Sequence, residues 1–185
     1  GGHPVSTITY PNAQSPAPHT FTVECPDGWS SRPVPRALLL LTEDATITET
    51  GDDDFHPNMV ISHSRVPRRI SLQDVGVSTL VAASKLGDDA HLEVGKVGRL
   101  DGRTVYIQTL ALTVDRTGQR VAQVHVIFYG PDDADRDARG DADSDAIADL
   151  YTLVGTCLDA DSAQYAPVFI EIVRSLTFGD RLVTA

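Results

Sequence analysis

Tyr151-Thr-Leu-Val-Gly-Thr-Cys-Leu158, followed by Asp159 to Phe178, has the clearest secondary-structure pattern in the chain. The first half is rich in β-branched and aromatic residues, which favours a strand. In the second half, apolar residues recur every three or four positions, at Tyr165, Val168, Phe169, Ile172, Val173 and Leu176. This spacing predicts an amphipathic helix, followed by a short closing strand. Pro167 predicts that the helix begins late or bends, because proline cannot donate a hydrogen bond to the preceding turn.

The part of the chain before residue 90 predicts short strands and one further helix. Alternating apolar residues predict a strand over His19–Cys25, and Pro26-Asp27-Gly28 predicts a turn after it. Further strands are expected over 37–41 and 58–66. Ser71-Leu-Gln-Asp74 has the pattern of a capping box and predicts a helix that reaches about Leu86. The residues expected to face inward are Leu72, Val75, Leu80, Ala83 and Leu86, with Gly87 ending the helix.

The middle of the chain predicts a three-stranded antiparallel meander over 91–100, 105–114 and 121–129. Asp101-Gly102 is a strong two-residue hairpin signal between the first two strands. The whole pattern predicts one α+β domain over residues 19–180, with a mainly antiparallel sheet and two helices packed on it. Residues 1–18 form a proline-rich N-terminal arm, in which Val5 to Tyr10 alternates enough to lie along a sheet edge.

Residues 131–149 contain eight aspartates and almost no large apolar residue. Such a segment cannot bury enough surface to order itself, so it predicts a mobile acidic loop. Asp133, Asp135 and Asp137 occupy the first, third and fifth positions of a calcium-binding EF-hand pattern. The pattern then fails, because Ala138 stands where glycine is needed and Ser144 where glutamate is needed. A solvated acidic loop is therefore favoured over a calcium site.

Composition excludes several classes of function. The 185-residue chain carries a formal charge of −11, which argues against a nucleic-acid partner because phosphate binding needs a basic face. The longest apolar run, Ala37–Leu41, fits a buried strand and predicts no transmembrane segment. No targeting segment is visible, and the compartment stays open between the cytoplasm and the cell envelope.

The two cysteines, Cys25 and Cys157, end two of the expected strands. In a secreted protein they would be expected to form a disulfide bond, which stabilises the fold by closing a long loop. In a cytosolic protein they would be small buried apolar residues. Both alternatives stay open at the level of the sequence.

Residues able to carry out catalysis are dispersed. The six histidines have no metal-ligand spacing. His63 lies between Ser62 and Ser64, but adjacent strand residues point to opposite faces and cannot form a nucleophile–base pair. No phosphate-binding loop, dinucleotide motif or nucleophile elbow is present. The sequence thus predicts no catalytic residue, no cofactor and no metal site, and an unrecognised hydrolase is the least favoured function.

The chain resembles the PsbP-like superfamily over roughly residues 19 to 178. The segments that carry the resemblance are Phe21–Trp29, Asp101-Gly102 with Gly118, Tyr151–Thr156, Tyr165–Phe169 and Ile172–Phe178. The superfamily includes the extrinsic photosystem protein P, the Ran-binding Mog protein and bacterial lipoproteins of the LpqN type. The resemblance implies an α/β/α sandwich around an antiparallel sheet and a non-enzymatic accessory or binding role, with no shared catalytic residues. No lipid-acceptor cysteine stands at the start of the sequence, which counts against membrane anchoring.

These observations favour a non-catalytic accessory or protein-binding domain, with a role in the bacterial cell envelope as one version of it. The expected contact surface is the sheet face around Trp29 together with Tyr106 and Tyr129 of the long hairpins. The alternative is a carrier or sensor that binds an apolar small molecule between sheet and helix. An apolar pocket would favour the carrier. A filled core beneath an exposed apolar patch would favour the protein-binding domain.

Overall fold

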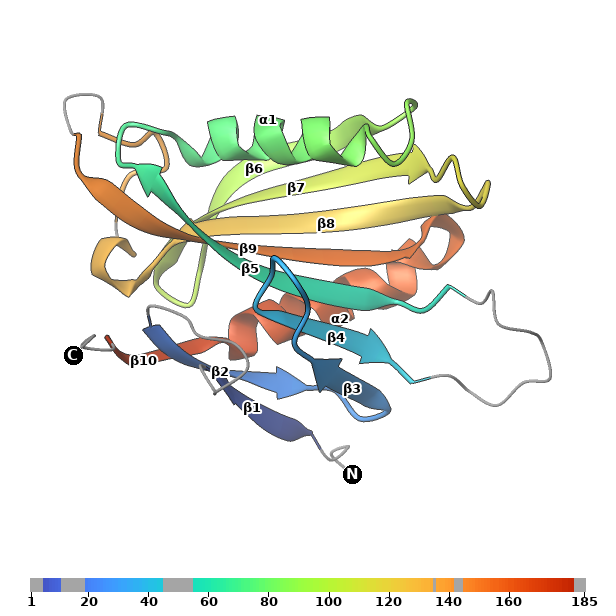
Figure 1. Cartoon of the computed structure of the whole chain (residues 1–185), viewed down its shortest axis with the longest axis horizontal. Helices are drawn as coiled ribbons and strands as arrows, with labels where there is room; N and C mark the ends of the chain where they lie inside the picture. The colour runs from blue at the N-terminus through green and yellow to red at the C-terminus, as the bar shows by residue number, and fades with distance from the viewer. Residues whose placement is uncertain (1–4, 11–18, 45–54, 135, 142–144, 182–185) are drawn as a thin grey trace.

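The fold is built on two antiparallel sheets and two helices (Figure 1). The computed structural model describes residues 5–10, 19–44, 55–134, 136–141 and 145–181. Three strands form the smaller sheet, in the order β1 (Ser6–Tyr10), β2 (His19–Cys25) and β10 (Thr177–Arg181). The larger sheet has seven strands in the order β3 (Trp29–Arg32), β4 (Leu39–Glu43), β5 (Asn58–Pro67), β9 (Ile147–Leu158), β8 (Arg120–Tyr129), β7 (Arg103–Thr113) and β6 (His91–Leu100).

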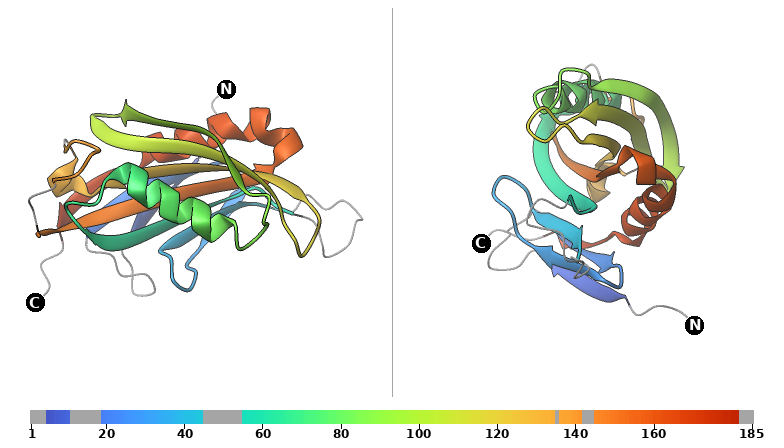
Figure 2. Two further views of the ribbon diagram at one scale, coloured as in Figure 1. Left: turned by 90° about the horizontal axis from the view of Figure 1, so that it is seen from above. Right: turned by 90° about the vertical axis from the view of Figure 1, so that its right-hand side faces the viewer.

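The larger sheet is covered by a helix on each face. Helix α1 (Leu72–Ala83) packs on β7 and β8, whereas α2 (Ser162–Ser175) packs on β8 and β9 from the other side and also contacts β2. The sheet is strongly curved, and α1 lies on the side towards which it curls (Figure 2). The predicted α+β class, with a mainly antiparallel sheet flanked by helices, is confirmed.

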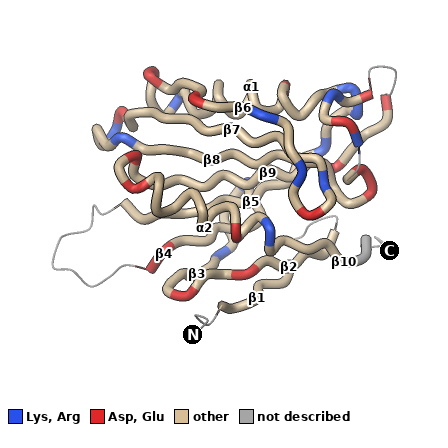
Figure 3. Tube along the Cα trace, turned by 180° about the vertical axis from the view of Figure 1, so that it is seen from behind, with Lys and Arg blue, Asp and Glu red and all other residues tan. Residues whose placement is uncertain are grey.

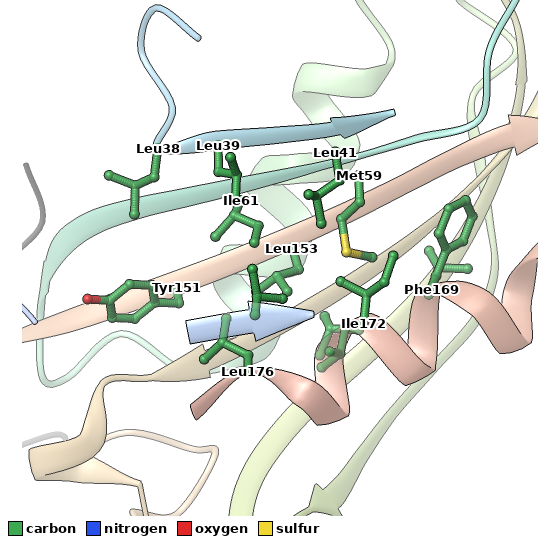
Figure 4. Close-up of a cluster of buried hydrophobic side chains, with 14 of the residues drawn as sticks. Leu38, Leu39, Leu41, Met59, Ile61, Tyr151, Leu153, Phe169, Ile172 and Leu176 are labelled. Carbon is green, nitrogen blue, oxygen red and sulfur yellow. The ribbon is translucent and has the colours of Figure 1, made fainter. Parts of the chain in front are cut away.

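The segment from β9 to β10 holds the main core together. Buried side chains of β9 and α2 meet residues from β2, β4 and β5, as Figure 4 shows for Leu153, Met59 and Ile172. The ring of Phe169 lies directly on Gly155, where an added Cβ would come within 2.5 Å of the ring. At the other end of the same strand, the Tyr151 and Phe178 rings lie 4.8 Å apart.

Helix α2 follows the predicted stripe and accommodates its proline. A short 3₁₀ turn, η2 (Asp159–Asp161), precedes it, and the regular helix starts at Ser162, so the predicted late start is confirmed. Pro167 lies inside the helix on its exposed side. Five residues of the predicted stripe are buried: Tyr165, Phe169, Ile172, Val173 and, directly after the helix, Leu176.

Helix α1 begins as predicted and ends earlier than predicted. Ser71 Oγ accepts from the Asp74 N–H at 3.0 Å, and Asp74 Oδ2 accepts from the Ser71 N–H at 3.4 Å, which completes the capping box. The helix ends at Ala83, so Leu86 falls outside the helical period and is exposed, contrary to prediction. Gly87 lies beyond the end of the helix and does not terminate it. It allows the chain to pass close to β7, since a Cβ there would lie 2.0 Å from the Thr113 carbonyl oxygen.

The predicted meander is confirmed as β6, β7 and β8. Asp101 and Gly102 both have positive φ, 47° and 82°, which is the conformation of a type I′ hairpin turn. Leu100 and Arg103 pair directly across this turn. A bulge interrupts the β6–β7 register between Leu92 and Val94.

Two segments predicted to lie outside the core are paired or hydrogen-bonded. In the predicted arm, Ser6–Tyr10 pairs with β2, as its alternation indicated. The predicted loop 131–149 is shorter, because β9 starts at Ile147 and a 3₁₀ turn, η1 (Pro131–Asp133), opens the segment. Carbonyls of this segment accept backbone hydrogen bonds from residues outside it, among them Ala138 from Leu72 and Ala134 from Thr104. Polar contacts therefore hold the described part of this segment where apolar ones are lacking.

Replacing Gly155 by alanine tests the close packing of β9 and α2. The added methyl would collide with the Phe169 ring, so we expect Gly155→Ala to lower the free energy of unfolding by about 1–3 kcal/mol. Gly98→Ala on β6 is the matched control, because nothing lies within 4 Å of a Cβ there. Urea denaturation of both variants measures the difference, and equal stabilities would contradict the predicted contact.

Candidate functional site

Helix α1 has an unusual composition for a helix at the surface. Of its twelve residues only Asp74 is charged, and Val77 and Val81 are 61% and 56% exposed on the side away from the sheet. These valines leave apolar area in contact with water, where a surface helix usually carries polar or charged residues. The outer side of α1 is therefore a surface suited to contact with another molecule.

Strand β6 lies beside this helix and forms one edge of the larger sheet. Leu92 and Val97, which pair with Leu110 and Tyr106 on the α1 face, are 44% and 48% exposed. Between helix and strand, the Tyr106 ring fills the space beside Gly76 of α1 and Gly95 of β6, where an added Cβ would lie 2.5 Å and 2.3 Å from its atoms. We call Val77, Val81, Leu92 and Val97 the helix–edge surface.

This surface concentrates the exposed apolar residues of the described chain. Eight large apolar residues of the described chain are exposed, and four of them belong to this surface: Val77, Val81, Leu92 and Val97. Charged residues gather in the turns at the two ends of the sheet, whereas β7, β8 and β9 carry few (Figure 3). A pocket of about 460 Å³ opens at one end of the helix–edge surface, lined by Gln73, Val97, Asp137, Ala138 and Arg139.

Sequence reasoning missed Val77 and Val81, because the expected inward stripe did not include them. Their signal was nevertheless present in the chain. Between Leu72 and Ala83 the sequence contains no lysine, arginine or glutamate. A surface helix normally carries such residues on its outer face.

A buried polar network lies directly beneath α1. His125 of β8 is in its centre: Nε2 lies 2.8 Å from Gln123 Oε1, and Nδ1 lies 3.0 Å from Thr79 Oγ1. Gln108 Nε2 donates to the Gly76 carbonyl at 3.0 Å and to Thr79 Oγ1 at 2.8 Å. The network thus joins two strands of the sheet to one turn of the helix and fixes the position of α1.

Burial sets the charge state of His125. Desolvation lowers the pKa of this imidazole from 6.5 to about 4. A neutral ring fits its neighbours, because Nε2–H donates to the Gln123 carbonyl oxygen and Nδ1 accepts from the opposite side. The residue is therefore a structural histidine whose two ring nitrogens both have hydrogen-bond partners.

A second group of polar residues lies where β2, β5 and β9 approach one another. His63 Nε2 lies 2.9 Å from Asp149 Oδ1, and His19 Nδ1 lies 3.1 Å from the Tyr151 hydroxyl. Burial, followed by the nearby Asp149 charge, raises the pKa of Tyr151 far above its ordinary value, so that the hydroxyl stays protonated. Among the residues that the structure describes, the hydrogen-bond partners of these two histidines are Tyr151 and Asp149, and no serine, threonine or cysteine is among them.

The three aromatic residues expected to form one contact surface lie on different faces. Trp29 packs edge-on against Phe169 on the α2 side, with ring centroids 6.4 Å apart. Tyr106 and Tyr129 lie beneath α1 and are only 7% and 1% exposed, and the Tyr129 hydroxyl donates to the Ile70 carbonyl at 2.7 Å. Both tyrosines are therefore core residues, and the exposed surface above them is formed by α1 and β6.

The two cysteines are both buried in the main core, as free thiols. Burial raises the pKa of Cys157 to about 11, with further contributions from Asp161 and Asp159. Burial also raises the pKa of Cys25. In the structure, Cys25 and Cys157 are therefore buried thiols, and no disulfide bond joins them.

The described residues offer no group of three histidine, cysteine or acidic side chains placed to hold a metal ion. In the same residues, the structure has no helix with the length and apolarity to span a membrane.

Comparison with solved structures identifies the fold. LpqN of Mycobacterium tuberculosis, involved in cell envelope biogenesis, has a TM-score of 0.64 at 14% identity, covering 95% of this chain and 92% of LpqN. Cyanobacterial PsbP from Synechocystis sp. PCC 6803 has a TM-score of 0.59 at 13% identity, covering 94% and 93%. The Saccharomyces cerevisiae Ran-binding protein Mog1p has a TM-score of 0.53 at 10% identity, covering 95% and 96%. The chain therefore has the PsbP-like fold, as its sequence resemblance predicted. No protein-family model and no curated protein matches the sequence.

The depressed pKa of His125 predicts a loss of stability in acid. The unfolded chain takes up this proton near pH 6.5, whereas the folded protein does so only near pH 4. The free energy of unfolding should therefore fall by roughly 3 kcal/mol as the pH drops from 6.5 to about 4. Above pH 6.5 the neutral His125 contributes its full stabilisation. His125→Gln should remove this part of the pH dependence. Urea denaturation at several pH values measures it, with His91→Gln at an exposed position as the control.

The buried thiols predict low reactivity in the folded protein. At pH 8 we expect neither Cys25 nor Cys157 to react with an aromatic disulfide reagent, because both pKa values are raised and both side chains are buried. Both thiols should titrate after denaturation without a reductant. Failure of both to titrate in the denatured protein would instead demonstrate a disulfide bond.

Proposed function

We propose that this protein is a non-catalytic accessory domain that binds a protein partner through the helix–edge surface. The observation that carries the proposal is the concentration of exposed apolar residues on α1 and β6. Exposed apolar residues gathered on one side of a protein are typical of sites of protein–protein contact. The polar network beneath α1 supports the proposal, because it holds the helix rigidly in place for binding.

The filled interior supports protein binding over ligand carriage. Phe169 occupies the space between α2 and the sheet at Gly155, and Tyr106 occupies the space beneath α1 at Gly76. A carrier would keep one of these spaces open for its ligand. The likeness to Ran-binding Mog1p agrees with a binding role, and the likeness to LpqN supports the version of the proposal that places it in the cell envelope.

The charge of the chain indicates what such a partner offers. With a formal charge of −11, the protein attracts partners with a basic rim and repels acidic ones. The helix–edge surface itself is apolar, flanked by Asp74 and by the acidic pair Asp88 and Asp89. We therefore expect a partner protein that presents an apolar contact surrounded by lysine or arginine.

Exchanging the two exposed valines of α1 for glutamine tests the proposal. A photo-crosslinking residue at Val81 should capture the partner in cells, and the purified partner should then bind the wild-type protein. Val77→Gln with Val81→Gln should weaken this binding about tenfold or more, because it removes apolar area that the two valines would bury against the partner. Isothermal titration calorimetry measures the change.

The matched control is Ser78→Gln with Ala82→Gln, at exposed positions of the same helix. This variant should bind within about twofold of the wild type and unfold at the same temperature. Equal binding by both double variants would overturn the proposal. Crosslinking of Val81 to no protein would do the same.

A groove on the outer side of α2 supports a second candidate function, the carriage of an apolar small molecule. It has a volume of about 350 Å³ and is lined by Val5, Glu24, Pro26, Pro167, Val168, Glu171 and Ile172. Native mass spectrometry of the purified protein tests this candidate. A bound lipid that is lost in Val168→Asp would favour the carrier, and a ligand-free mass would exclude it for the purified protein.

A further inference from the structure

The outer side of α1 carries two adjacent rows of exposed side chains. Residues four apart on a helix lie one above the other, with Cβ atoms about 5–6 Å apart. One row is bulky and consists of Val77, Val81 and Lys85, and the other is short and consists of Asp74, Ser78 and Ala82. All six residues are exposed, and no described element lies over them (Figures 1 and 2). The helix therefore presents a ridge with a shallow groove beside it.

The two ends of this outer side carry opposite charges. The N–H of Lys85 bonds to the Ala82 carbonyl at 3.2 Å, so the turn after α1 keeps Lys85 in line with its row. Within the described residues Lys85 enters no ion pair. At the other end, the Asp74 carboxylate accepts from the Ser71 N–H at 3.4 Å. A carboxylate can accept several hydrogen bonds, so Asp74 can also bind a cation.

A second copy of α1, packed antiparallel on the first, matches these rows. When the two-fold axis passes between Thr79 and Leu80, the bulky row of each copy faces the short row of the other. The facing pairs are then Val77 with Ala82, Val81 with Ser78 and Lys85 with Asp74. A ridge of bulky side chains packed into a groove of short ones lets two helices approach closely.

The polar groups of this contact keep their partners when a second copy covers them. Ser78 Oγ donates to the Asp74 carbonyl of its own helix at 3.2 Å, so covering Ser78 leaves no unpaired hydroxyl proton. The Lys85 ammonium of each copy meets the Asp74 carboxylate of the other, and the axis repeats this pair at both ends. Ion pairs at such an exposed rim add little affinity, but they determine which arrangement forms.

The charges favour one register over its neighbours. Sliding one copy by a helical turn in one direction places Asp74 opposite Val81 and leaves Lys85 without a carboxylate. Sliding it in the other direction places Asp74 opposite Asp89, which opposes two carboxylates. A parallel arrangement would place each charge opposite itself. Only the antiparallel register centred between Thr79 and Leu80 pairs opposite charges at both ends.

We propose that two copies of this chain associate through antiparallel packing of α1 on α1. The interface is isologous, as expected for a closed dimer. It consists mainly of one helix face from each copy, which is small for an interface, so the association is weak and reversible. The dimer covers Val77 and Val81 and thereby excludes a partner protein from them. That consequence rests on the proposed function, whereas the dimer itself does not.

Ser78→Gln with Ala82→Gln tests the dimer separately from partner binding. The longer side chains fill the groove that the valines of the second copy enter, and they leave the valines of their own chain in place. Analytical ultracentrifugation in about 0.15 M salt, which screens distant charges, should show a wild-type dimer with a dissociation constant on the order of 0.1 mM. The double variant should raise this constant about tenfold or more. Ala163→Gln, at an exposed alanine of α2, is the matched control and should leave it unchanged.

Reversing the charges at the two ends tests the register. Lys85→Asp and Asp74→Lys each oppose like charges at both ends of their own dimer, so each should weaken self-association about threefold or more. An equimolar mixture of the two variants should restore it as a heterodimer, because opposite charges then meet at both ends. Asp74 also caps α1, so the unfolding temperature of Asp74→Lys is measured alongside.

Three results would overturn the proposal. The first is a wild-type protein that stays monomeric up to roughly 1 mM. The second is a dimer that Ser78→Gln with Ala82→Gln leaves unaffected. The third is a mixture of folded charge variants that associates no better than either variant alone. None of these results bears on partner binding, which Val77→Gln with Val81→Gln tests against the purified partner.

Discussion

Burial of strand β8 on both faces is the constraint on which the rest of the structure depends. All residues from Val121 to Tyr129 are buried, so one face of this strand needs α1 and the other needs α2. Helix α1 precedes the β6–β8 meander in the sequence and α2 follows β9, and both must be in place before β8 is shielded from water. The central strand thereby couples the packing of the two layers.

Double burial also explains the polar network beneath α1. Gln123 and His125 are on the face of β8 that α1 covers, where unsatisfied polar groups would each cost several kcal/mol. Gln108 and Thr79 satisfy them and join the sheet to the helix. Apolar contacts alone would let α1 slide along the sheet, whereas hydrogen bonds at defined positions fix it in one place.

The predictable parts of the fold were those with a local physical cause. The capping box at Ser71, the turn at Asp101-Gly102 and the stripe of α2 each depend on residues close in sequence, and each is confirmed. The placement of Tyr106 and Tyr129 depends on which face of a doubly buried strand each side chain points to. Apolar residues occupy both faces of such a strand, so alternation cannot distinguish them. The approach of His63 to Asp149 likewise depends on the β5–β9 register, which joins residues far apart in the sequence.

Close packing gives the strongest reason to look for function on the outside of this protein. Gly155 admits Phe169, Gly76 and Gly95 admit Tyr106, and in each case the contact leaves no room even for a methyl group. A fold that uses glycine to bring aromatic rings against its backbone has filled the spaces between helix and sheet. The valines on the outer side of α1 make no such contacts, although burying one would contribute about 1.5–3 kcal/mol. Because the spaces between helix and sheet are already filled, a contact with another molecule is what could bury the exposed valines of α1.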